Sequence, residues 1–287
     1  EQKLKVGVLG ATGMVGQRFV TLLENHPWFE LVAVAASPRS AGKTYEEAVG
    51  GRWKMKTPMP EAAKKLVVLN VNQVEEVAAQ VDFVFSAVDM SKDEIRAIEE
   101  AYAKAEVPVV SNNSAHRWTP DVPMMVPELN PEHAEIIPYQ RKRLGTKRGF
   151  IAVKPNCSIQ SYTPALHALR EFEPTLVVAT TYQAISGAGK TFKDWPEMID
   201  NVIPYIAGEE EKSEQEPLRI WGKIEDGVIK KAEGPLITTQ CIRVPVEDGH
   251  TAAVFVNFKK KPTKEEIIDR WNNFSGEPQK LNLPSAT

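Results

Sequence analysis

The chain has 287 residues, of which 42% are hydrophobic and 25% are charged, with a formal net charge of −3 at pH 7. That length is enough for two domains, and the composition is typical of an ordinary globular protein. The slight acidic excess argues against nucleic acid or a membrane surface as the main partner. No apolar run could span a bilayer, no signal-peptide pattern is present, and two cysteines cannot form a disulfide framework. We therefore expect a cytoplasmic protein.

The first hundred residues alternate between short apolar runs and helix-like segments. The apolar runs lie at 5–9, 31–36, 66–71, 81–88 and 107–111, and the helical patterns lie at 14–24 and 92–104. Short buried strands separated by helices predict an α/β fold with a parallel sheet, a doubly wound Rossmann-type domain. Prolines concentrate between Pro120 and Pro138 and break regular structure. We place the boundary there, with a dinucleotide-binding domain at 1–130 and a second domain at 131–287.

The second domain contains longer segments in which apolar and polar residues alternate, at 175–185, 236–245 and 251–258. These segments predict an α+β catalytic and dimerisation domain with a mainly antiparallel sheet. One face of such a sheet packs on helices, and the other is available to a partner subunit. The charge-dense segment Gly208–Glu216 predicts a solvated helix face.

A glycine-rich loop follows the first apolar run. Gly10, Gly13 and Gly16 have the spacing G-x-x-G-x-x-G, a variant of the dinucleotide fingerprint, between a strand and a helix. Glycines let the backbone approach a pyrophosphate, whose charge the helix N-terminus stabilises. A tight turn alone would also explain the glycines, but the order strand, loop, helix favours dinucleotide binding.

The end of the second apolar run indicates which dinucleotide is bound. An NAD site places a carboxylate there for the ribose 2′-hydroxyl. Here Ala36 is followed by Ser37, Arg39 and Ser40, which supply hydroxyls and a cation. Arginine binds phosphate through paired hydrogen bonds, so the sequence favours NADP as the cofactor.

Cys157 is the candidate nucleophile. It lies between a strand at 150–153 and a helical pattern at 159–170, so we expect it near a helix N-terminus, which favours a thiolate. A thiolate is a good nucleophile and a good acyl leaving group, and both properties serve thioester chemistry. Most free cysteines are packing residues, and Cys241, inside an apolar strand, fits that interpretation.

His250 is the favoured proton-transfer partner of the thiol, because it stands at a turn before a strand. His26 and His133 are interpreted as surface residues, and His116 stays open as an alternative. Arg243 ends the preceding strand and suits a substrate carboxylate, although a surface ion pair would explain it equally. Metal binding is not expected, since no close His or Cys pair has ligand spacing.

Seven motifs occur in the order found in one known family. They are GATGMVG (10–16), ASPRSAGK (36–43), SNNSAHR (111–117), PNCS (155–158), YQAISGAGK (182–190), GEEEK (208–212) and RVPVEDGH (243–250). With these motifs the chain resembles the aspartate-semialdehyde dehydrogenases, in particular their archaeal and fungal branch. Family members run further at the C-terminus, where the chain returns to the first domain. That return is not found in the sequence, and two explanations stay open: a partial chain, or a form without this element.

The resemblance implies roles for individual residues. Cys157 would be the nucleophile that forms a thiohemiacetal and a thioester, His250 the general acid/base, and Gln183 the residue that orients the intermediate. The implied binding residues are, for substrate, Arg243, Glu209 (or a neighbour within Glu209–Glu211) and Asn156; for phosphate, Arg117, Lys212 and Asn112; and for NADP, Gly10, Thr12, Gly13, Met14, Val15, Gly16, Ser37, Arg39, Ser40, Ser86, Ser186 and Gly187.

The implied reaction is the reduction of L-4-aspartyl phosphate by NADPH to L-aspartate 4-semialdehyde and phosphate, in a homodimer or homotetramer. Two alternatives stay open at this point. A malonyl-CoA reductase-like sister enzyme would use the same thioester chemistry. A catalytically silent nucleotide-binding protein would tolerate loss of Cys157 or His250, and both residues are present.

Overall fold

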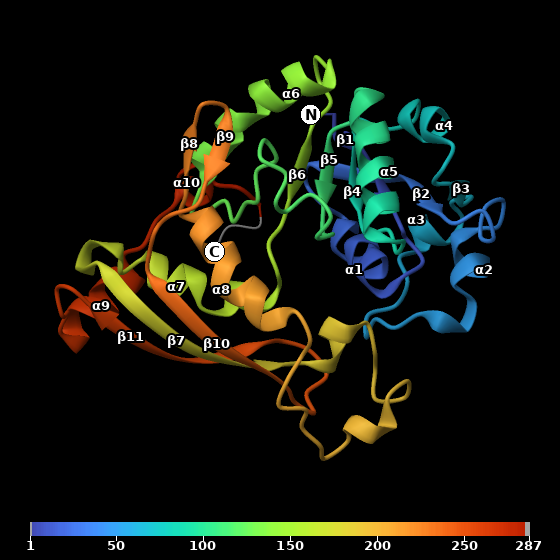
Figure 1. Cartoon of the computed structure of the whole chain (residues 1–287). Helices are drawn as coiled ribbons and strands as arrows, with labels where there is room; N and C mark the ends of the chain where they lie inside the picture. The colour runs from blue at the N-terminus through green and yellow to red at the C-terminus, as the bar shows by residue number, and fades with distance from the viewer. Residues whose placement is uncertain (1, 285–287) are drawn as a thin grey trace. The chain divides into compact units, whose positions relative to one another are not determined.

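The computed structural model describes residues 2–284, so Glu1 and the C-terminal residues 285–287, which belong to the two expected domains, lie outside the described part. The described chain forms two compact units (Figure 1). The first comprises the residues up to Pro123 together with Ala134–Lys154, and the second comprises Met124–His133 and the residues from Pro155 onward. The chain therefore enters the second unit at Met124–His133, returns to the first unit for Ala134–Lys154, and then continues in the second unit.

The first unit is built on a six-stranded sheet of order β3-β2-β1-β4-β5-β6, in which every pair is parallel. This is the strand order of a doubly wound dinucleotide-binding fold, the fold class that the sequence predicts. The strands are β1 (Leu4–Leu9), β2 (Phe29–Ala36), β3 (Leu69–Asn70), β4 (Phe83–Ser86), β5 (Val109–Ser111) and β6 (Ile151–Val153). Strand β6 lies beyond the boundary expected at residue 130 and still pairs with β5, so a single boundary does not describe the first unit.

The helices of the first unit are α1 (Met14–Leu23), α2 (Tyr45–Val49), α3 (Glu61–Lys64), α4 (Val74–Ala78), α5 (Lys92–Lys104) and α6 (Ile137–Leu144), with a 3-10 turn η1 (Gly50–Arg52). Helix α5 has the bounds that its periodicity predicts. Ser91 and Glu94 form a capping box at its start, in which each side chain binds the backbone N–H of the other residue.

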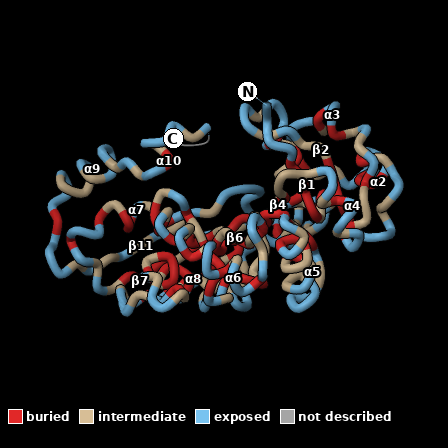
Figure 2. Tube along the Cα trace, turned by 90° about the horizontal axis from the view of Figure 1, so that it is seen from above, coloured by how far each residue is buried: buried red, intermediate tan, exposed pale blue. Residues whose placement is uncertain are grey.

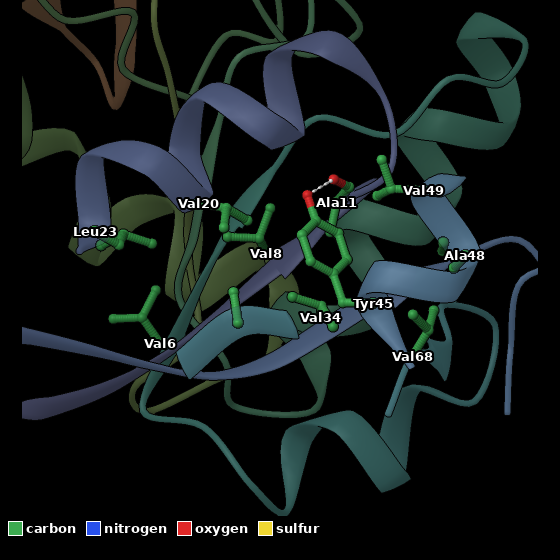
Figure 3. Packing of buried hydrophobic residues seen from close by; sticks show 12 residues of the cluster. Val6, Val8, Ala11, Val20, Leu23, Val34, Tyr45, Ala48, Val49 and Val68 are labelled. Atoms are coloured by element: carbon green, nitrogen blue, oxygen red, sulfur yellow. Dashed lines mark hydrogen bonds between the residues drawn. The ribbon is translucent and has the colours of Figure 1, made fainter. Parts of the chain in front are cut away.

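The core of the first unit lies between β1, β2 and the helices that pack on them (Figures 2 and 3). Val6, Val8 and Val34 are fully buried in it. The phenol of Tyr45 also lies in this core, and its hydroxyl donates a 2.7 Å hydrogen bond to the carbonyl of Ala11. Because Ala11 belongs to the glycine loop, the core itself fixes the backbone of that loop.

The second unit is built on a three-stranded sheet of order β10-β7-β11 (Figure 1). The strands are β7 (Pro174–Gln183), β10 (Leu236–Arg243) and β11 (Thr251–Phe258). Strand β11 pairs with β7 antiparallel, but β10 pairs with β7 parallel, so the sheet is mixed and the expectation of a mainly antiparallel sheet is wrong in this respect. The cause is that β7 lies between β10 and β11, which keeps these two consecutive strands apart.

The remaining elements of the second unit are helices α7 (Thr163–His167), α8 (Glu209–Ile220), α9 (Lys264–Asn272) and α10 (Glu277–Lys280), the hairpin strands β8 (Lys223–Glu225) and β9 (Val228–Lys230), and the 3-10 turns η3 (Ser158–Ser161), η4 (Arg170–Phe172), η5 (Ile185–Ala188) and η6 (Pro196–Met198). A further turn, η2 (Pro131–Ile136), belongs partly to each unit. Within residues 2–284, no helix combines the length and apolar character needed to cross a membrane.

The sheet of the second unit has one covered and one open face. Buried and accessible residues alternate along β7 and β10, as the sequence predicts. The open face carries large apolar side chains, among them Leu236 and Phe255, which are 69% and 79% exposed.

Candidate active site

The glycine loop joins β1 to α1 in the first unit. Gly10 has a φ of +75°, and a Cβ on it would lie 2.3 Å from the carbonyl oxygen of Ala87. A Cβ on Gly16 would lie 2.1 Å from the carbonyl oxygen of Gly10. A Cβ on Gly13, by contrast, would have its nearest neighbour at 3.8 Å, so the fold does not require glycine there. The lack of a side chain at Gly13 leaves room beside the loop. Two glycines are therefore required by the fold, and the third keeps the backbone accessible to a ligand.

A pocket of about 250 Å³ opens at the ends of β1, β2 and β4. It is lined by Gly10, Thr12, Gly13, Ala36, Ser37, Arg52, Val71, Ala87, Val88, Asp89 and Met90. This is the edge at which doubly wound sheets bind dinucleotides. The loop glycines, the hydroxyl of Ser37 and the cation of Arg52 fit a phosphate-bearing ligand.

Several of the other expected cofactor residues lie outside this pocket. Arg39 is exposed in the loop after β2 and, like Ser40, is absent from the lining of this pocket. Arg52 lines the pocket although nothing in the sequence singles it out; its Nη2 donates to the carbonyl of Ala48 at 2.7 Å. Ser186 and Gly187 lie in the second unit, in η5.

Ser86 belongs to a buried polar network below the strand ends. Its hydroxyl accepts a 3.3 Å hydrogen bond from Asn113 Nδ2, and the same nitrogen donates to Glu99 Oε2 at 3.2 Å. Ser111 Oγ donates to this carboxyl oxygen at 2.5 Å. Burial raises the pKa of Glu99 above the usual range of a glutamate, against the opposing effect of these hydrogen bonds. The network ties the ends of β4 and β5 to α5.

Cys157 and His250 meet in the second unit. The two residues are 93 positions apart, and Cys157 Sγ lies 3.1 Å from His250 Nε2. Cys157 precedes η3, a turn of four residues, and Tyr162 interrupts the helical run with a φ of −131°. The expected continuous helix over 159–170 is therefore wrong, since only Thr163–His167 within it is α-helical, and the short turn contributes little macrodipole at the sulfur. The neighbouring imidazole is the main polar group at the thiol.

The backbone of Ala184 selects the tautomer of His250. Its N–H donates a 2.9 Å hydrogen bond to His250 Nδ1. A backbone amide can only donate, so Nδ1 is the accepting nitrogen and the proton of the neutral ring is on Nε2. This proton faces Cys157 Sγ, and His250 is therefore arranged as a hydrogen-bond donor to the sulfur.

Arg243 shares this site. Its Nη1 donates a 2.6 Å hydrogen bond to the carbonyl of Ala184, and its side chain is almost fully buried. Burial lowers the pKa of the guanidinium, while the charges of Glu209 and Cys157 oppose that shift. A Cβ on Gly187 would lie 3.0 Å from Arg243 Nη1 and 3.0 Å from His250 Cε1. The structure thus brings Arg243 and His250 together across η5, as their spacing suggests.

Asn156 and Glu209 are in direct contact beside the thiol. Asn156 Nδ2 donates to Glu209 Oε2 at 2.6 Å, and Asn156 Oδ1 accepts bonds from the backbone N–H and the hydroxyl of Ser158. Gln183, at the end of β7, is buried, and its Oε1 accepts a 2.9 Å bond from Thr181 Oγ1. The expected substrate residues therefore lie in the same unit as Cys157.

The three expected phosphate residues are divided between the units. Asn112 and Arg117 belong to the first unit, where Arg117 donates from Nε to the carbonyl of Lys154 at 3.0 Å and from Nη2 to that of Asn112 at 3.2 Å. Lys212 belongs to the second unit, three residues after Glu209 on α8. A shared phosphate site of these residues stays a prediction.

Two further histidines, His116 and His133, are buried in the structure. His133 was expected at the surface but is only 1% exposed, and its Nε2 lies 2.9 Å from the carbonyl oxygen of Gly222, so that expectation is wrong. His116 is fully buried, with its Nε2 3.1 Å from the carbonyl oxygen of Arg96, and serves the packing of α5. Cys241 is fully buried, as expected.

The strand order of the first unit and the cysteine–histidine pair of the second define a class of protein, the nicotinamide-dependent dehydrogenases that carry a thiol. Comparison with known families agrees. The model "Semialdehyde dehydrogenase, NAD binding domain" matches residues 5–137, and "Semialdehyde dehydrogenase, dimerisation domain" matches residues 165–284. Together with the relatives described next, these matches show that the chain belongs to the aspartate-semialdehyde dehydrogenase family and is an oxidoreductase.

The relatives include archaeal and fungal proteins. The chain is 42% identical over 284 residues to the aspartate-semialdehyde dehydrogenase of Methanothermobacter thermautotrophicus, covering 99% of this chain and 79% of the relative. It is 42% identical over 290 residues to that of Aspergillus fumigatus, covering 99% and 78%. The crystal structure of the Candida albicans aspartate-semialdehyde dehydrogenase with NADP superposes with a TM-score of 0.84 at 36% identity, covering 98% of this chain and 79% of that one. The resemblance inferred from the sequence motifs is confirmed.

Proposed function

We propose that this chain is an NADP-dependent enzyme that converts L-4-aspartyl phosphate to L-aspartate 4-semialdehyde and phosphate through a thioester on Cys157. This reaction serves the biosynthesis of lysine, methionine and threonine. One observation carries the proposal: the 3.1 Å contact between Cys157 Sγ and His250 Nε2, beside Arg243, in a chain of this family.

In the proposed reaction the Cys157 thiolate attacks the acyl carbon of the substrate. The bond from this carbon to the phosphate oxygen breaks, phosphate leaves with the electron pair, and an aspartyl thioester remains on Sγ. NADPH supplies, when bound, a hydride to the thioester carbon. The oxyanion of the resulting thiohemiacetal then collapses, the carbon–sulfur bond breaks, and the semialdehyde departs. The sulfur is again a thiolate, so the cycle needs no net proton transfer at Cys157.

His250 acts in this scheme as a hydrogen-bond donor. Its Nε2–H first stabilises the thiolate and then the oxyanion of the thiohemiacetal. The reverse reaction starts from the aldehyde and requires removal of the thiohemiacetal proton. A general base needs a lone pair on Nε2 and hence a proton on Nδ1, opposite the N–H of Ala184. The acid half of the expected acid/base role is thus favoured by this tautomer, and the base half requires the contact with Ala184 to break.

Charge and burial support the substrate assignment. A buried arginine beside the thiol suits the α-carboxylate of an amino-acid substrate, because a guanidinium binds a carboxylate with paired hydrogen bonds. Glu209, in contact with Asn156, would take the substrate amino group, and Gln183 would orient the intermediate. Arg117 and Lys212, with Asn112, would hold the phosphate. The semialdehyde enzyme is preferred over a malonyl-CoA reductase because a CoA thioester substrate would need no site for an α-amino group.

NADP would bind in the first unit, over the glycine loop. Support comes from the pocket at the strand ends, from the loop glycines, and from the absence of a carboxylate at the end of β2. The crystal structure of the relative from Candida albicans, which contains NADP, also supports NADP over NAD as the cofactor. Residues 10–16 would hold the pyrophosphate, and Ser37, Arg39 and Ser40 the 2′-phosphate. Ser86, Ser186 and Gly187 complete the proposed set.

The proposed assembly is a homodimer or homotetramer. The second unit carries the dimerisation domain of the family, and the open face of its sheet exposes Leu236 and Phe255. Burial of such a face in a subunit contact removes apolar surface from water. In functional terms we propose that residues 1–130 bind NADP and that 131–287 carry catalysis and dimerisation. A cytoplasmic location stays a prediction from the sequence.

The test is NADP reduction by purified protein at alkaline pH with L-aspartate 4-semialdehyde and phosphate. We expect growth of absorbance at the nicotinamide band that requires phosphate and is lost in Cys157→Ser. A matched variant, Cys241→Ser, removes the other thiol and should retain activity. Activity with malonyl-CoA and NADPH instead would establish the sister enzyme. Binding of NADP without turnover of either substrate would establish the silent nucleotide-binding protein.

A further inference from the structure

Helix α8 buries a polar stripe. Glu209, Ser213 and Glu216 are spaced by four and three residues, so they share one face of the helix. Ser213 is 0% and Glu216 is 1% exposed. The buried face of a helix is normally apolar, and a carboxyl group is expensive to bury. A buried carboxyl on such a face therefore indicates a specific partner, and it corrects the expectation that Gly208–Glu216 is a solvated face throughout.

The partner of this stripe is the segment that carries the thiol. Glu216 Oε1 accepts a 2.6 Å hydrogen bond from the backbone N–H of Asn156, the residue before Cys157. Ser213 contacts the residues that follow, because its carbonyl accepts a 2.9 Å bond from Tyr162 and its hydroxyl lies 3.4 Å from that of Ser158. One helix face thus holds the thiol segment on both sides of the cysteine.

The hydrogen bond to Glu216 acts on the peptide group between Pro155 and Asn156, one residue before Cys157. Cys157 directly precedes a four-residue turn and not a long helix, so the backbone around it depends on outside contacts. The bond from the Asn156 N–H to Glu216 therefore fixes the backbone just before Cys157, whose Sγ lies 3.1 Å from His250 Nε2.

We propose that Glu216 is a positioning residue of this active site, which acts through the N–H of Asn156 to hold Cys157 against His250. This inference rests on the proposed function, since it assigns a task to Glu216 in the same reaction. Glu216 touches no reacting atom in this scheme. Its effect is transmitted through the backbone hydrogen bond from Asn156, and it depends on the reach of the side chain.

Two variants separate reach from charge. Glu216→Gln keeps the length and an accepting carbonyl oxygen but has no charge. Glu216→Asp keeps the carboxylate but is shorter by one methylene, so it cannot make the 2.6 Å bond without movement of the segment. Glu214→Asp is the matched control, because Glu214 lies on the same helix, is half-buried, and accepts a longer bond, 3.3 Å, from the N–H of Thr239.

Two readouts are measured on each purified full chain: kcat and KM for L-aspartate 4-semialdehyde, and the rate at which iodoacetamide alkylates Cys157, followed by peptide mass spectrometry. We expect Glu216→Asp to lower kcat and the alkylation rate about ten- to hundred-fold, with KM within about three-fold, as for a misplaced reacting group. Glu216→Gln should stay within about three-fold of the unchanged protein, and Glu214→Asp within about two-fold.

Unchanged kcat and alkylation in Glu216→Asp would overturn the proposal. An equal loss in Glu216→Gln and Glu216→Asp would overturn it too, because the charge and not the bond to Asn156 would then matter. A protein that does not turn over the semialdehyde at all would refute the proposed function, while the alkylation rates would still decide whether Glu216 positions the thiol.

Discussion

Gly187 offers the sharpest steric test of the site. It is part of η5, and a Cβ on it would meet Arg243 Nη1 at 3.0 Å, His250 Cε1 at 3.0 Å and His250 Nε2 at 3.2 Å. The optimal separation of non-bonded carbon atoms is about 3.5 Å or more. In Gly187→Ala, both side chains must therefore move by about 0.5 Å, and His250 moves relative to Cys157 Sγ.

The size of the effect follows from this displacement. A misplacement of about 1 Å costs about a hundred-fold in rate, so half of it should cost about ten-fold, or about 1.4 kcal/mol of transition-state stabilisation. Stability should change less, because alanine is favoured over glycine by about 0.5–1 kcal/mol in a helical turn and offsets part of the overpacking. We expect kcat/KM to fall about ten-fold while the unfolding midpoint shifts little.

The assay is initial-rate NADP reduction with L-aspartate 4-semialdehyde and phosphate, combined with urea unfolding of the same samples. Gly51→Ala is the control, because a Cβ on Gly51 meets nothing within 4 Å, and its kinetics should be unchanged. If Gly187→Ala kept kcat/KM within two-fold of the parent, the close packing of His250 and Arg243 would not govern the reaction, and the reasoning would be refuted.

Three further perturbations test charge and ionisation. Burial lowers the pKa of His167 from 6.5 to about 4, so between these values the unfolded chain binds a proton that the folded chain does not, and stability is lost as pH falls from 6.5 towards 4. In urea unfolding, the unfolding free energy of His167→Gln should therefore change less over this pH range than that of the parent, by about 1–2 kcal/mol. Burial raises the pKa of Glu99, so its stabilising effect is present at low pH and is lost as pH rises through the raised value; relative to Glu99→Gln, the parent should lose unfolding free energy with rising pH, and equal pH profiles would contradict this. Arg39→Asp should lower the ratio of NADP to NAD activity about ten-fold or more, and an unchanged ratio would leave Arg52 as the cation for the 2′-phosphate.

Local patterns were sufficient for most of the first unit. Helix α5 has the bounds that its periodicity predicts, because its capping box and apolar spacing are encoded within fifteen residues. The glycine loop was equally predictable, since its spacing and its place between a strand and a helix are local features of the sequence. The contact that requires Gly16 lies within the loop, whereas the contact that requires Gly10 is made with Ala87, far along the chain.

Strand pairing was not predictable in the same way. Alternation of apolar and polar residues indicates a half-covered strand, but it is the same for parallel and antiparallel neighbours. The parallel pair of β10 with β7 and the return of β6 to the first sheet are set by contacts between distant segments. The charge-dense start of α8 misled in a related way, because Glu216 is buried by a segment sixty residues away.

The sequence indicated which residues meet at the candidate site, but not the hydrogen bonds and distances between them. Chemistry and family resemblance pointed to Cys157, His250 and Arg243, which the structure places together. The backbone N–H of Ala184, which selects the tautomer of His250, carries no side-chain signal. Arg52 and Glu216 were missed for a similar reason, since charged residues are common on surfaces and only their burial or position in the fold marks them.

The thioester on Cys157 is the central claim, and mass spectrometry of the stalled enzyme tests it most directly. Protein, NADP and L-aspartate 4-semialdehyde are mixed without phosphate, so that the acyl group has no acceptor other than water, and the reaction is quenched in acid and digested. The account predicts an aspartyl group on the peptide that contains Cys157, matched by about one equivalent of reduced nicotinamide and absent in Cys157→Ser. Reduced nicotinamide without any acylated peptide, or acylation that persists in Cys157→Ser, would contradict it.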